Sequence, residues 1–201
     1  YNAGGLVGDN GGNVYHSYAT GAVSGENGAG GLAGFNEVMS TADIKDNSIN
    51  ESYATGPVTG SEDVGGLVGF NKGIIVNSYV TGSVTGARRG SVFVGGLVGY
   101  RKLASGASIS RCYFTGHVRA VFQCGAFSGH AYSSADDDPV SSSYWNEEAG
   151  DVELSDAVPL STEAMQQASS FSGWSFNTSA WGIVAGESFP YLNGMLNAPF
   201  A

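Results

Sequence analysis

Acidic side chains are the most closely clustered residues of this chain that could take part in chemistry. Hard cations bind oxygen-rich clusters of this kind. Asp136, Asp137 and Asp138 are consecutive, and Glu147 and Glu148 follow shortly afterwards. Calcium needs about six to eight oxygens that converge on one point. Neither the EF-hand loop nor the Gly-Gly-x-Gly-x-Asp nonapeptide is present. We therefore predict a solvated acidic loop, with a weak calcium site at Asp136–Asp138 as the alternative.

The three histidines do not build a recognisable catalytic or metal site. His16 precedes a Ser-Tyr pair, His117 follows Thr-Gly, and His130 opens a loop. The chain has no His-x-x-x-His, no Cys-x-x-Cys and no nucleophile elbow, the patterns that bring metal ligands or an activated nucleophile together. We predict surface or corner roles for the histidines, no catalytic residue and no cofactor.

The two cysteines raise the question of a disulfide. Cys112 and Cys124 lie 12 residues apart, and a disulfide needs their Cα atoms within about 7 Å of each other. Two sides of a flattened fold could approach that closely. The sequence therefore does not decide whether Cys112 and Cys124 form a disulfide. The alternative is that both are small buried side chains.

The charge balance excludes several classes of partner. The net charge is −10, only 13% of the residues are charged, and just eight are Lys or Arg. Binding to nucleic acid or to an anionic membrane depends on clustered basic side chains. No apolar stretch is long enough for a transmembrane helix. We therefore predict no nucleic-acid partner and no membrane-embedded segment.

Two alternating phrases organise the first three quarters of the chain and must position these residues. The first phrase occurs as Gly-Gly-Leu-(Val/Ala)-Gly from Gly4, Gly30, Gly65 and Gly95, with a degenerate copy from Gly125. The second occurs as Ser-Tyr-(Ala/Val)-Thr-Gly from Ser17, Ser52 and Ser78, as a variant from Cys112, and truncated from Ser143. Gly4, Ser17 and Gly30 are 13 residues apart, so the minimal unit has 26 residues. Longer repeats contain insertions.

The short period favours stacked strands over other repeat folds. Each phrase is short, rich in Val, Leu, Tyr and Thr, and bounded by glycine, as strands and tight corners are. No helical spacing of apolar residues persists in residues 1–145. A propeller blade needs about 40–50 residues, so a propeller, like a sandwich, is less favoured. We predict an all-β, parallel β-helix-like solenoid of about five repeats of 26–35 residues over residues 1–146.

Stacking of coils predicts columns of like residues. The expected tyrosine column is Tyr18, Tyr53, Tyr79, Tyr113 and Tyr144, and the expected leucine column is Leu6, Leu32, Leu67 and Leu97, continued by Phe127. Val23, Val58, Val84 and Val118 form a third column. Asn10, Asn36 and Asn71 should form an amide ladder that ends at Arg101, because side-chain amides can bond from rung to rung.

Residues 147–201 depart from the repeat and are predicted to form a C-terminal cap. Ser161 is a suitable N-cap for a short helix within residues 164–170, and aromatic residues are dense in the rest of the segment. The open end of a solenoid exposes strand edges and core, which such a segment could cover. The alternative is an aromatic carbohydrate-binding platform that includes Trp174 and Trp181.

The insertions carry the remaining candidates for binding. Insertions of repeat proteins often gather on one face, and that face often binds a ligand. Arg88 and Arg89 lie in one insertion, and Arg101 and Lys102 begin another. We take these four as candidates for a binding face, with tolerated surface variation as the alternative.

The segment VGGLVGFNKGIIVNSYVTGSVTG resembles the GLUG motif, named for its Gly-Leu-apolar-Gly core. The resemblance covers residues 1–146 in four good copies, and the tail resembles the segment that often follows such arrays. Such repeats occur in bacterial surface and secreted proteins, including adhesins similar to filamentous haemagglutinin and IgA-cleaving metallopeptidases outside their catalytic part. The resemblance implies a β-helical stalk or adhesive region outside the cell.

Two functions from different classes follow from the residues and the resemblance together. The first is a non-catalytic structural or adhesive segment that binds a protein or glycan surface, or copies of itself end to end as a fibre. The second is a carbohydrate-binding module that uses tail aromatics or insertion loops. An enzyme is disfavoured because no acid–base pair or partnered nucleophile can be assembled from the sequence.

Overall fold

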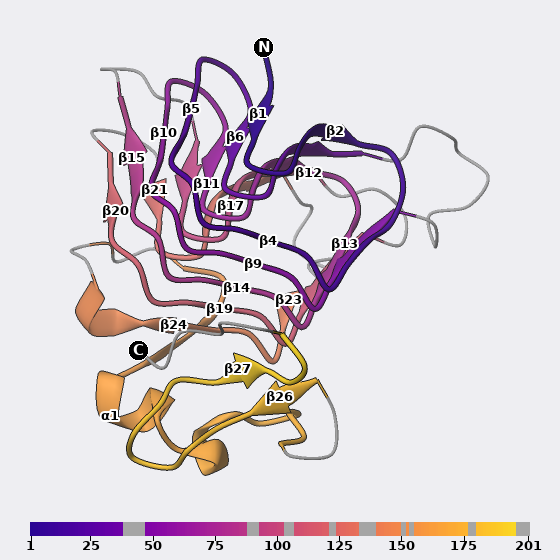
Figure 1. Cartoon of the computed structure of the whole chain (residues 1–201). Helices are drawn as coiled ribbons and strands as arrows, with labels where there is room; N and C mark the ends of the chain where they lie inside the picture. The colour runs from indigo at the N-terminus through magenta and orange to yellow at the C-terminus, as the bar shows by residue number, and fades with distance from the viewer. Residues whose placement is uncertain are drawn as a thin grey trace.

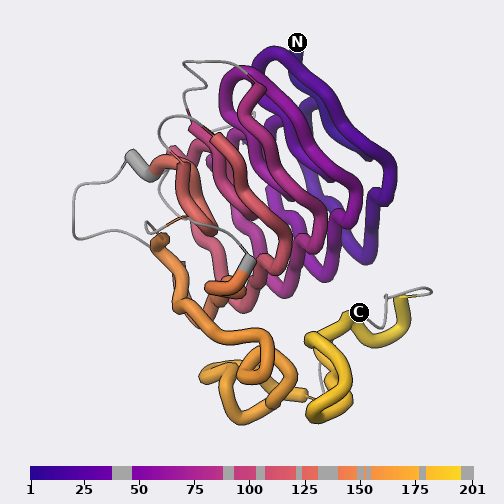
Figure 2. Tube along the Cα trace, turned by 90° about the vertical axis from the view of Figure 1, so that its left-hand side faces the viewer, coloured from indigo at the N-terminus to yellow at the C-terminus, as the bar shows by residue number. Residues whose placement is uncertain are grey.

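A computed structural model shows a parallel β-solenoid of five coils (Figure 1). It describes residues 1–37, 47–87, 93–102, 107–120, 124–132, 140–149, 152, 155–176 and 180–195. Viewed from the side, the coils lie next to one another like turns of a spring (Figure 2). The predicted fold class is confirmed. None of the helices in the described ranges has the length and apolarity needed to cross a bilayer.

Coils 1 to 4 each contribute short strands to five sheets, and coil 5 contributes to four of them. Coil 1 contains β1 (Ala3–Gly4), β2 (Val7–Asn10), β3 (Val14–Tyr15), β4 (Tyr18–Ala19) and β5 (Val23–Gly25). Coil 2 contains β6 (Ala29–Gly30), β7 (Ala33–Asn36), β8 (Ser48–Asn50), β9 (Tyr53–Ala54) and β10 (Val58–Gly60). Coil 3 contains β11 (Val64–Gly65), β12 (Val68–Asn71), β13 (Ile74–Val76), β14 (Tyr79–Val80) and β15 (Val84–Gly86).

The last two coils follow the same plan. Coil 4 contains β16 (Val94–Gly95), β17 (Val98–Lys102), β18 (Ser108–Ser110), β19 (Tyr113–Phe114) and β20 (Val118–Arg119). Coil 5 contains β21 (Cys124–Gly125), β22 (Ser128–Tyr132), β23 (Val140–Ser141) and β24 (Tyr144–Asn146). We call β2, β7, β12, β17 and β22 the asparagine sheet. We call β4, β9, β14, β19, β24 and β25 the tyrosine sheet.

Equivalent residues of adjacent coils are paired in register. Val58 of β10 pairs with Val23 of β5 on one side and with Val84 of β15 on the other. The sequence separations are 35 and 26 residues (58 − 23 and 84 − 58). The additional residues between β7 and β8 therefore leave the stacking unchanged. Insertions fall between strands because each strand must keep its partner above and below.

The interior is a narrow apolar core whose columns change in size along the axis. Leu32, Leu67, Leu97 and Phe127 are fully buried, as the leucine column predicts. The column that follows each tyrosine grows from Ala19 and Ala54 through Val80 and Phe114 to Trp145. The larger side chains fill the C-terminal end of the solenoid.

The glycines of the two phrases allow close approach of adjacent coils, and their φ angles are not positive. A Cβ on Gly66 would lie 2.2 Å from the carbonyl oxygen of Gly96, and one on Gly31 would lie 2.1 Å from that of Gly66. Positive φ occurs instead at ordinary corner residues, such as Glu51 and Asn77. Among the described glycines only Gly173, Gly186 and Gly194, all in the tail, have positive φ.

The tyrosines of the tyrosine sheet point outward and stack on one another. Ring centroids of Tyr18 and Tyr53, Tyr53 and Tyr79, and Tyr79 and Tyr113 are 5.1, 4.8 and 4.9 Å apart. The predicted tyrosine column is thus confirmed from Tyr18 to Tyr113, and Tyr144 pairs with Tyr113 in the same register. Burial raises the pKa of the Tyr79 and Tyr113 hydroxyls, so ionising either one is harder than ionising an exposed tyrosine.

The tail begins with η2 (Glu147–Ala149) and contains β25 (Val158–Leu160), α1 (Thr162–Met165), η3 (Ala168–Ser170), β26 (Trp181–Gly182) and β27 (Tyr191–Leu192). Ser161 is the N-cap of α1, and its Oγ accepts a hydrogen bond from Ala164 N at 3.2 Å. This confirms Ser161 as the N-cap of the helix. The α-helix is shorter than expected, and the 3₁₀ turn η3 follows it.

The tail covers one side of the solenoid as well as part of its end. β25 pairs with β24 and so occupies the C-terminal edge of the tyrosine sheet. The remaining segment lies beneath the tyrosine sheet (Figures 1 and 2), where Met165, Phe171, Trp181 and Leu192 form one apolar cluster with the tyrosines. The Tyr113 hydroxyl donates to Pro190 O at 2.6 Å. The tail therefore packs against the side of the solenoid more than a simple end cap would.

Candidate functional site

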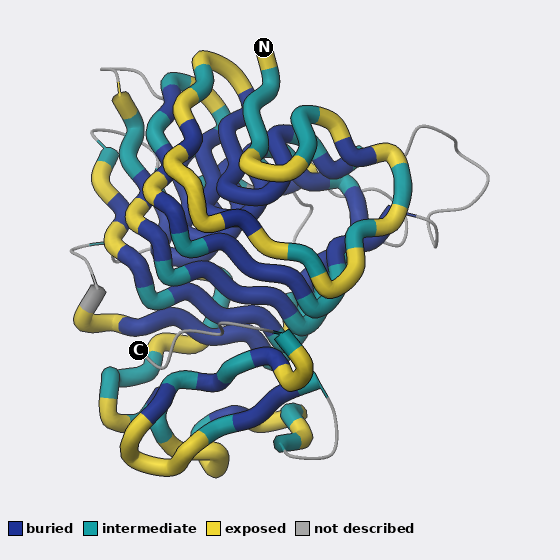
Figure 3. The backbone as a smooth tube through the Cα atoms, in the orientation of Figure 1, coloured by how far each residue is buried: buried dark blue, intermediate teal, exposed yellow. Residues whose placement is uncertain are grey.

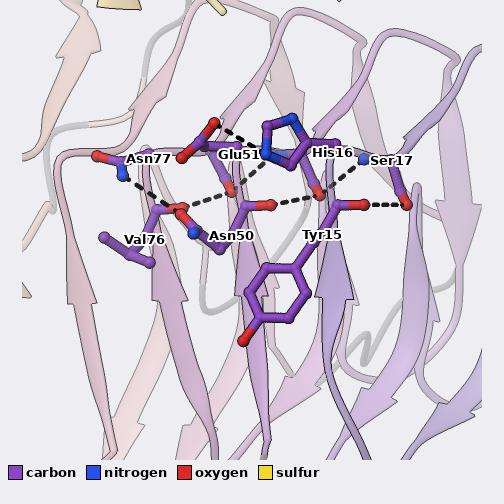
Figure 4. Close-up of polar contacts among 9 residues, drawn as sticks. Tyr15, His16, Ser17, Asn50, Glu51, Val76 and Asn77 are labelled. Carbon is purple, nitrogen blue, oxygen red and sulfur yellow. Dashed lines mark hydrogen bonds and ion pairs between the residues drawn. The ribbon is translucent and has the colours of Figure 1, made fainter. Parts of the chain in front are cut away.

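A surface column of corner residues links the coils through polar contacts (Figure 4). His16, Glu51, Asn77, Arg111 and Ser142 occupy the same corner and have φ between 45° and 51°. His16 Nε2 lies 3.3 Å from Glu51 Oε2, and Arg111 Nε donates to Asn77 Oδ1 at 2.9 Å. These contacts join the corners of coils 1 and 2 and of coils 3 and 4, and Asn77 Nδ2 donates to Asn50 Oδ1 of coil 2 at 3.2 Å, so the column helps to hold the turns in place.

A serine ladder follows immediately after these corners. Ser52 Oγ accepts a hydrogen bond from Ser17 N at 3.2 Å, and Ser78 Oγ accepts one from Ser52 N at 3.2 Å. Each hydroxyl also donates back to the carbonyl two residues earlier, as Ser17 Oγ does to Tyr15 O at 2.8 Å. Ser52 and Ser78 therefore each accept from the coil on their N-terminal side.

The predicted asparagine ladder is confirmed and has a direction. Asn10 Nδ2 donates to Asn36 Oδ1 at 2.8 Å, and Asn36 Nδ2 donates to Asn71 Oδ1 at 2.7 Å. Asn10 Oδ1 and Asn71 Oδ1 also accept from the backbone N–H groups of Gly12 and Gly73. A backbone N–H can only donate, so these contacts fix which amide atom is the oxygen. Each amide donates toward the C-terminus.

Arg101 ends this ladder inside the solenoid and is not part of a binding face. It pairs with Asn71 in the asparagine sheet and is 1% exposed. Its Nη2 atom lies 2.7 Å from Asp156 Oδ2 in the tail. The prediction that Arg101 belongs to a binding face is wrong, because Arg101 is still part of β17 and takes the inward position of an asparagine. The insertion starts after it. Lys102, the next residue, is exposed.

The outer edge of coil 1 is the most exposed apolar surface of the described chain. Leu6 and Tyr18 are 51% and 46% exposed, whereas the equivalent Leu32 and Tyr53 are 0% and 1% exposed. Tyr1 and Tyr15 of the same coil are also exposed. Figure 3 shows coil 1 mostly in yellow and teal and the inner coils in dark blue. All five strands of coil 1 end their sheets.

The possible disulfide between Cys112 and Cys124 is not formed. Cys112 is buried next to the tyrosine sheet, where its Sγ contacts Ser110 O at 3.3 Å. Cys124 begins β21 and pairs with Val94 in another sheet. Both thiols are free, because each side chain takes the position of its repeat column. Burial raises the pKa of the Cys112 thiol to about 12.

The two tryptophans of the tail are not arranged as a sugar-binding platform. Trp181 is 1% exposed and stacks on Trp174, with ring centroids 4.3 Å apart. Trp174 Nε1 donates to Ser142 O at 2.6 Å and so fastens the tail to coil 5. These rings are occupied by packing against the tyrosine column and against each other.

A second aromatic column, on the outer face of the asparagine sheet, was missed in the sequence. It contains Phe35, Phe70, Tyr100 and His130, with Phe93 packed between the last two. The signal was an aromatic residue directly after the last glycine of the first phrase. Phe35 and Phe70 stack with centroids 4.7 Å apart, and both residues are half-buried.

The remaining candidates differ in what can be said of them. Arg88, Arg89 and the run Asp136–Asp138 lie outside the described residues. The described residues contain no group of three or more His, Cys, Asp or Glu side chains that could hold a metal. A hollow of about 570 Å³ beside β20 is lined by His117, Val118, Arg119, Ala120, Cys124, Glu147, Glu148 and Val152.

Comparison with known proteins supports the repeat and goes no further. The family model of the GLUG motif matches residues 60–85, which span the end of β10 to the second residue of β15. This motif occurs in repeat-containing surface proteins. The resemblance seen in the sequence is thereby confirmed for coil 3. Neither the curated proteins nor the solved structures yield a match to the chain.

Proposed function

We propose that this chain is a non-catalytic structural and adhesive repeat segment of a bacterial surface or secreted protein, and that it acts outside the cell by stacking solenoid coils end to end. The GLUG motif of coil 3 supports this proposal, since the motif occurs in repeat-containing surface proteins. The polar columns support it too, because their hydrogen bonds join one coil to the next.

The outer edge of coil 1 is the observation that carries the proposal. Its five strands have backbone groups, a leucine and a tyrosine in the positions that inner coils use for stacking. Burial of a whole apolar side chain is worth about 1.5–3 kcal/mol. About half of Leu6 and Tyr18 is still exposed, so a further coil would gain about 1 kcal/mol at each.

Adhesion to a protein or glycan surface would use the insertions. Lys102, at the start of one insertion, is exposed. The alternative of a carbohydrate-binding module in the tail is less favoured, because Trp181 is buried and Trp174 is held by Ser142.

A labelling experiment on intact cells tests location and stacking separately. In a Cys124→Ser background, we would introduce Lys102→Cys or Tyr18→Cys into the native protein and add a membrane-impermeant maleimide. Lys102→Cys should react on intact cells, and reaction only after lysis would contradict an extracellular location. Tyr18→Cys should react rapidly in the isolated chain and slowly on cells. Equal rates would contradict stacking at this edge.

A further inference from the structure

The hydrogen-bonding ladders give the outer edge of coil 1 a polarity, and this polarity identifies what can stack on it. The asparagine ladder runs in one direction, because the Nδ2 groups of Asn10 and Asn36 each donate to the asparagine of the next coil. Asn10 is therefore the residue of the ladder whose Oδ1 faces outward. The residue is only 8% exposed. A carboxamide oxygen has two lone pairs, and Gly12 N takes one.

The serine ladder has the same direction. Ser52 and Ser78 each accept a backbone N–H from the preceding coil. By the same geometry, Ser17 Oγ donates to Tyr15 O and presents its lone pairs to the outer side of coil 1. Two side-chain acceptors therefore lie on this edge, on different sheets.

The backbone of coil 1 completes the pattern. Gly5 N and Leu6 N donate to Gly31 O and Leu32 O of coil 2, so the carbonyls of Gly5 and Leu6 face outward. In the tyrosine sheet the backbone N–H groups donate the other way, toward the coil on the N-terminal side, because Tyr53 N donates to Ser17 O. The N–H of Tyr18 consequently points outward as a donor.

We infer that the outer edge of coil 1 is a docking surface for the C-terminal edge of another GLUG-type coil, one with an asparagine in the ladder position. Such a coil supplies the asparagine Nδ2 and serine N–H donors that coil 1 accepts. It also continues the leucine and tyrosine columns in register. This inference rests on the stacking role proposed above and specifies the partner.

A second copy of this chain does not fit the surface. Its C-terminal coil has Ala131 in the ladder position, with Arg101 before it, so it offers no amide donor there. β25 already occupies the C-terminal edge of its tyrosine sheet. A head-to-head contact would reverse the order of the sheets around the axis and could not continue the asparagine, serine and leucine columns together.

A fusion protein tests the inference on the folded chain. A copy of residues 61–86 followed by one serine is joined ahead of Tyr1, which places a coil 3 unit on the outer edge of coil 1. The expected result is a higher melting temperature and slower hydrogen exchange at the Tyr18 amide. Unchanged stability and exchange would overturn the docking surface itself.

Two matched variants of the added coil test the polarity. Asn→Asp at the copy of Asn71 replaces the Nδ2 donor by an oxygen and should remove most of the gain in melting temperature. Asn→Asp at the copy of Asn77, which lies in the outward corner column, should retain the gain. Equal behaviour of the two variants would overturn the assigned polarity while leaving stacking intact.

The unfused chain provides the test of the excluded partner. Sedimentation over a wide concentration range should show no regular polymer. Ordered fibres of the unfused chain would contradict the exclusion of a second copy. Neither result depends on whether the native protein is extracellular, so failure here is distinct from failure of the cell-labelling experiment.

Discussion

At the scale of single residues, Asp63 is the one carboxyl in the described part of the chain whose pKa the fold clearly shifts. Burial raises its pKa from 3.8 to about 6, and the neighbouring Glu62 adds to the rise. A carboxyl whose pKa is higher in the folded state stabilises the fold when protonated. This contribution is complete below about pH 3.8 and is lost as the pH rises through about 6.

Asp63→Asn should therefore stabilise the protein near neutral pH and not in acid. Asparagine tolerates the positive φ of 47° at this position. We expect a gain of about 1 kcal/mol at pH 7.5, less than the full shift implies because the carboxyl is partly solvated. Thermal unfolding at pH 7.5 and pH 3.5 measures it. A gain of equal size at both pH values would contradict the assigned cause.

The stability of the fold should also depend on the ion pair between Arg101 and Asp156. Asp156→Ala removes the carboxylate that lies 2.7 Å from Arg101 Nη2, and removing one partner of a buried ion pair costs about 3 kcal/mol. Denaturant unfolding should show this loss. The double variant Arg101→Asn, Asp156→Ala removes the charge and restores an amide to the column, so it should recover most of the stability. A neutral single variant would show that the pair is not important to the fold.

At the scale of elements, the closeness of the coils depends on glycines that have no room for a methyl group. A Cβ on Gly56 would lie 2.0 Å from Gly21 O, whereas a Cβ on Gly21 would meet nothing within 4 Å. Gly56→Ala should cost at least about 1–3 kcal/mol through overpacking. Gly21→Ala, at the same repeat position, should be neutral or slightly stabilising. Unfolding midpoints that fall equally would argue against an open outer edge on coil 1.

The strands and columns could be predicted from the sequence because one register, repeated in every coil, fixes them. Tyr79 and Leu67 each have counterparts at the same phrase position, so one correct period places all of them. The repeat also places Arg101 at the end of the asparagine ladder, but its burial could not be predicted, because its partner Asp156 comes from outside the repeat. The lateral packing of the tail was also missed, since Tyr79 and Val80 are both apolar and the sequence does not say which faces outward.

At the scale of the whole molecule, a solenoid is close to one-dimensional, and its stability is about a sum over coils and their interfaces. Duplicating residues 61–86 in place adds a sixth coil between coils 2 and 4. The junction is native, because Gly86 and Gly60 occupy the same position. The tail still meets the tyrosines of the last three coils.

This duplication should lengthen the molecule by about 4.8 Å, the spacing of hydrogen-bonded strands, and should raise its melting temperature. Small-angle scattering and calorimetry measure the two effects. Duplicating only residues 61–85 is the matched control, because the missing Gly86 shortens the connection between the two copies by one residue and so opposes their pairing in register. If both duplications were equally stable, the columns would not determine the stacking. If neither folded, the coils would not be independent units.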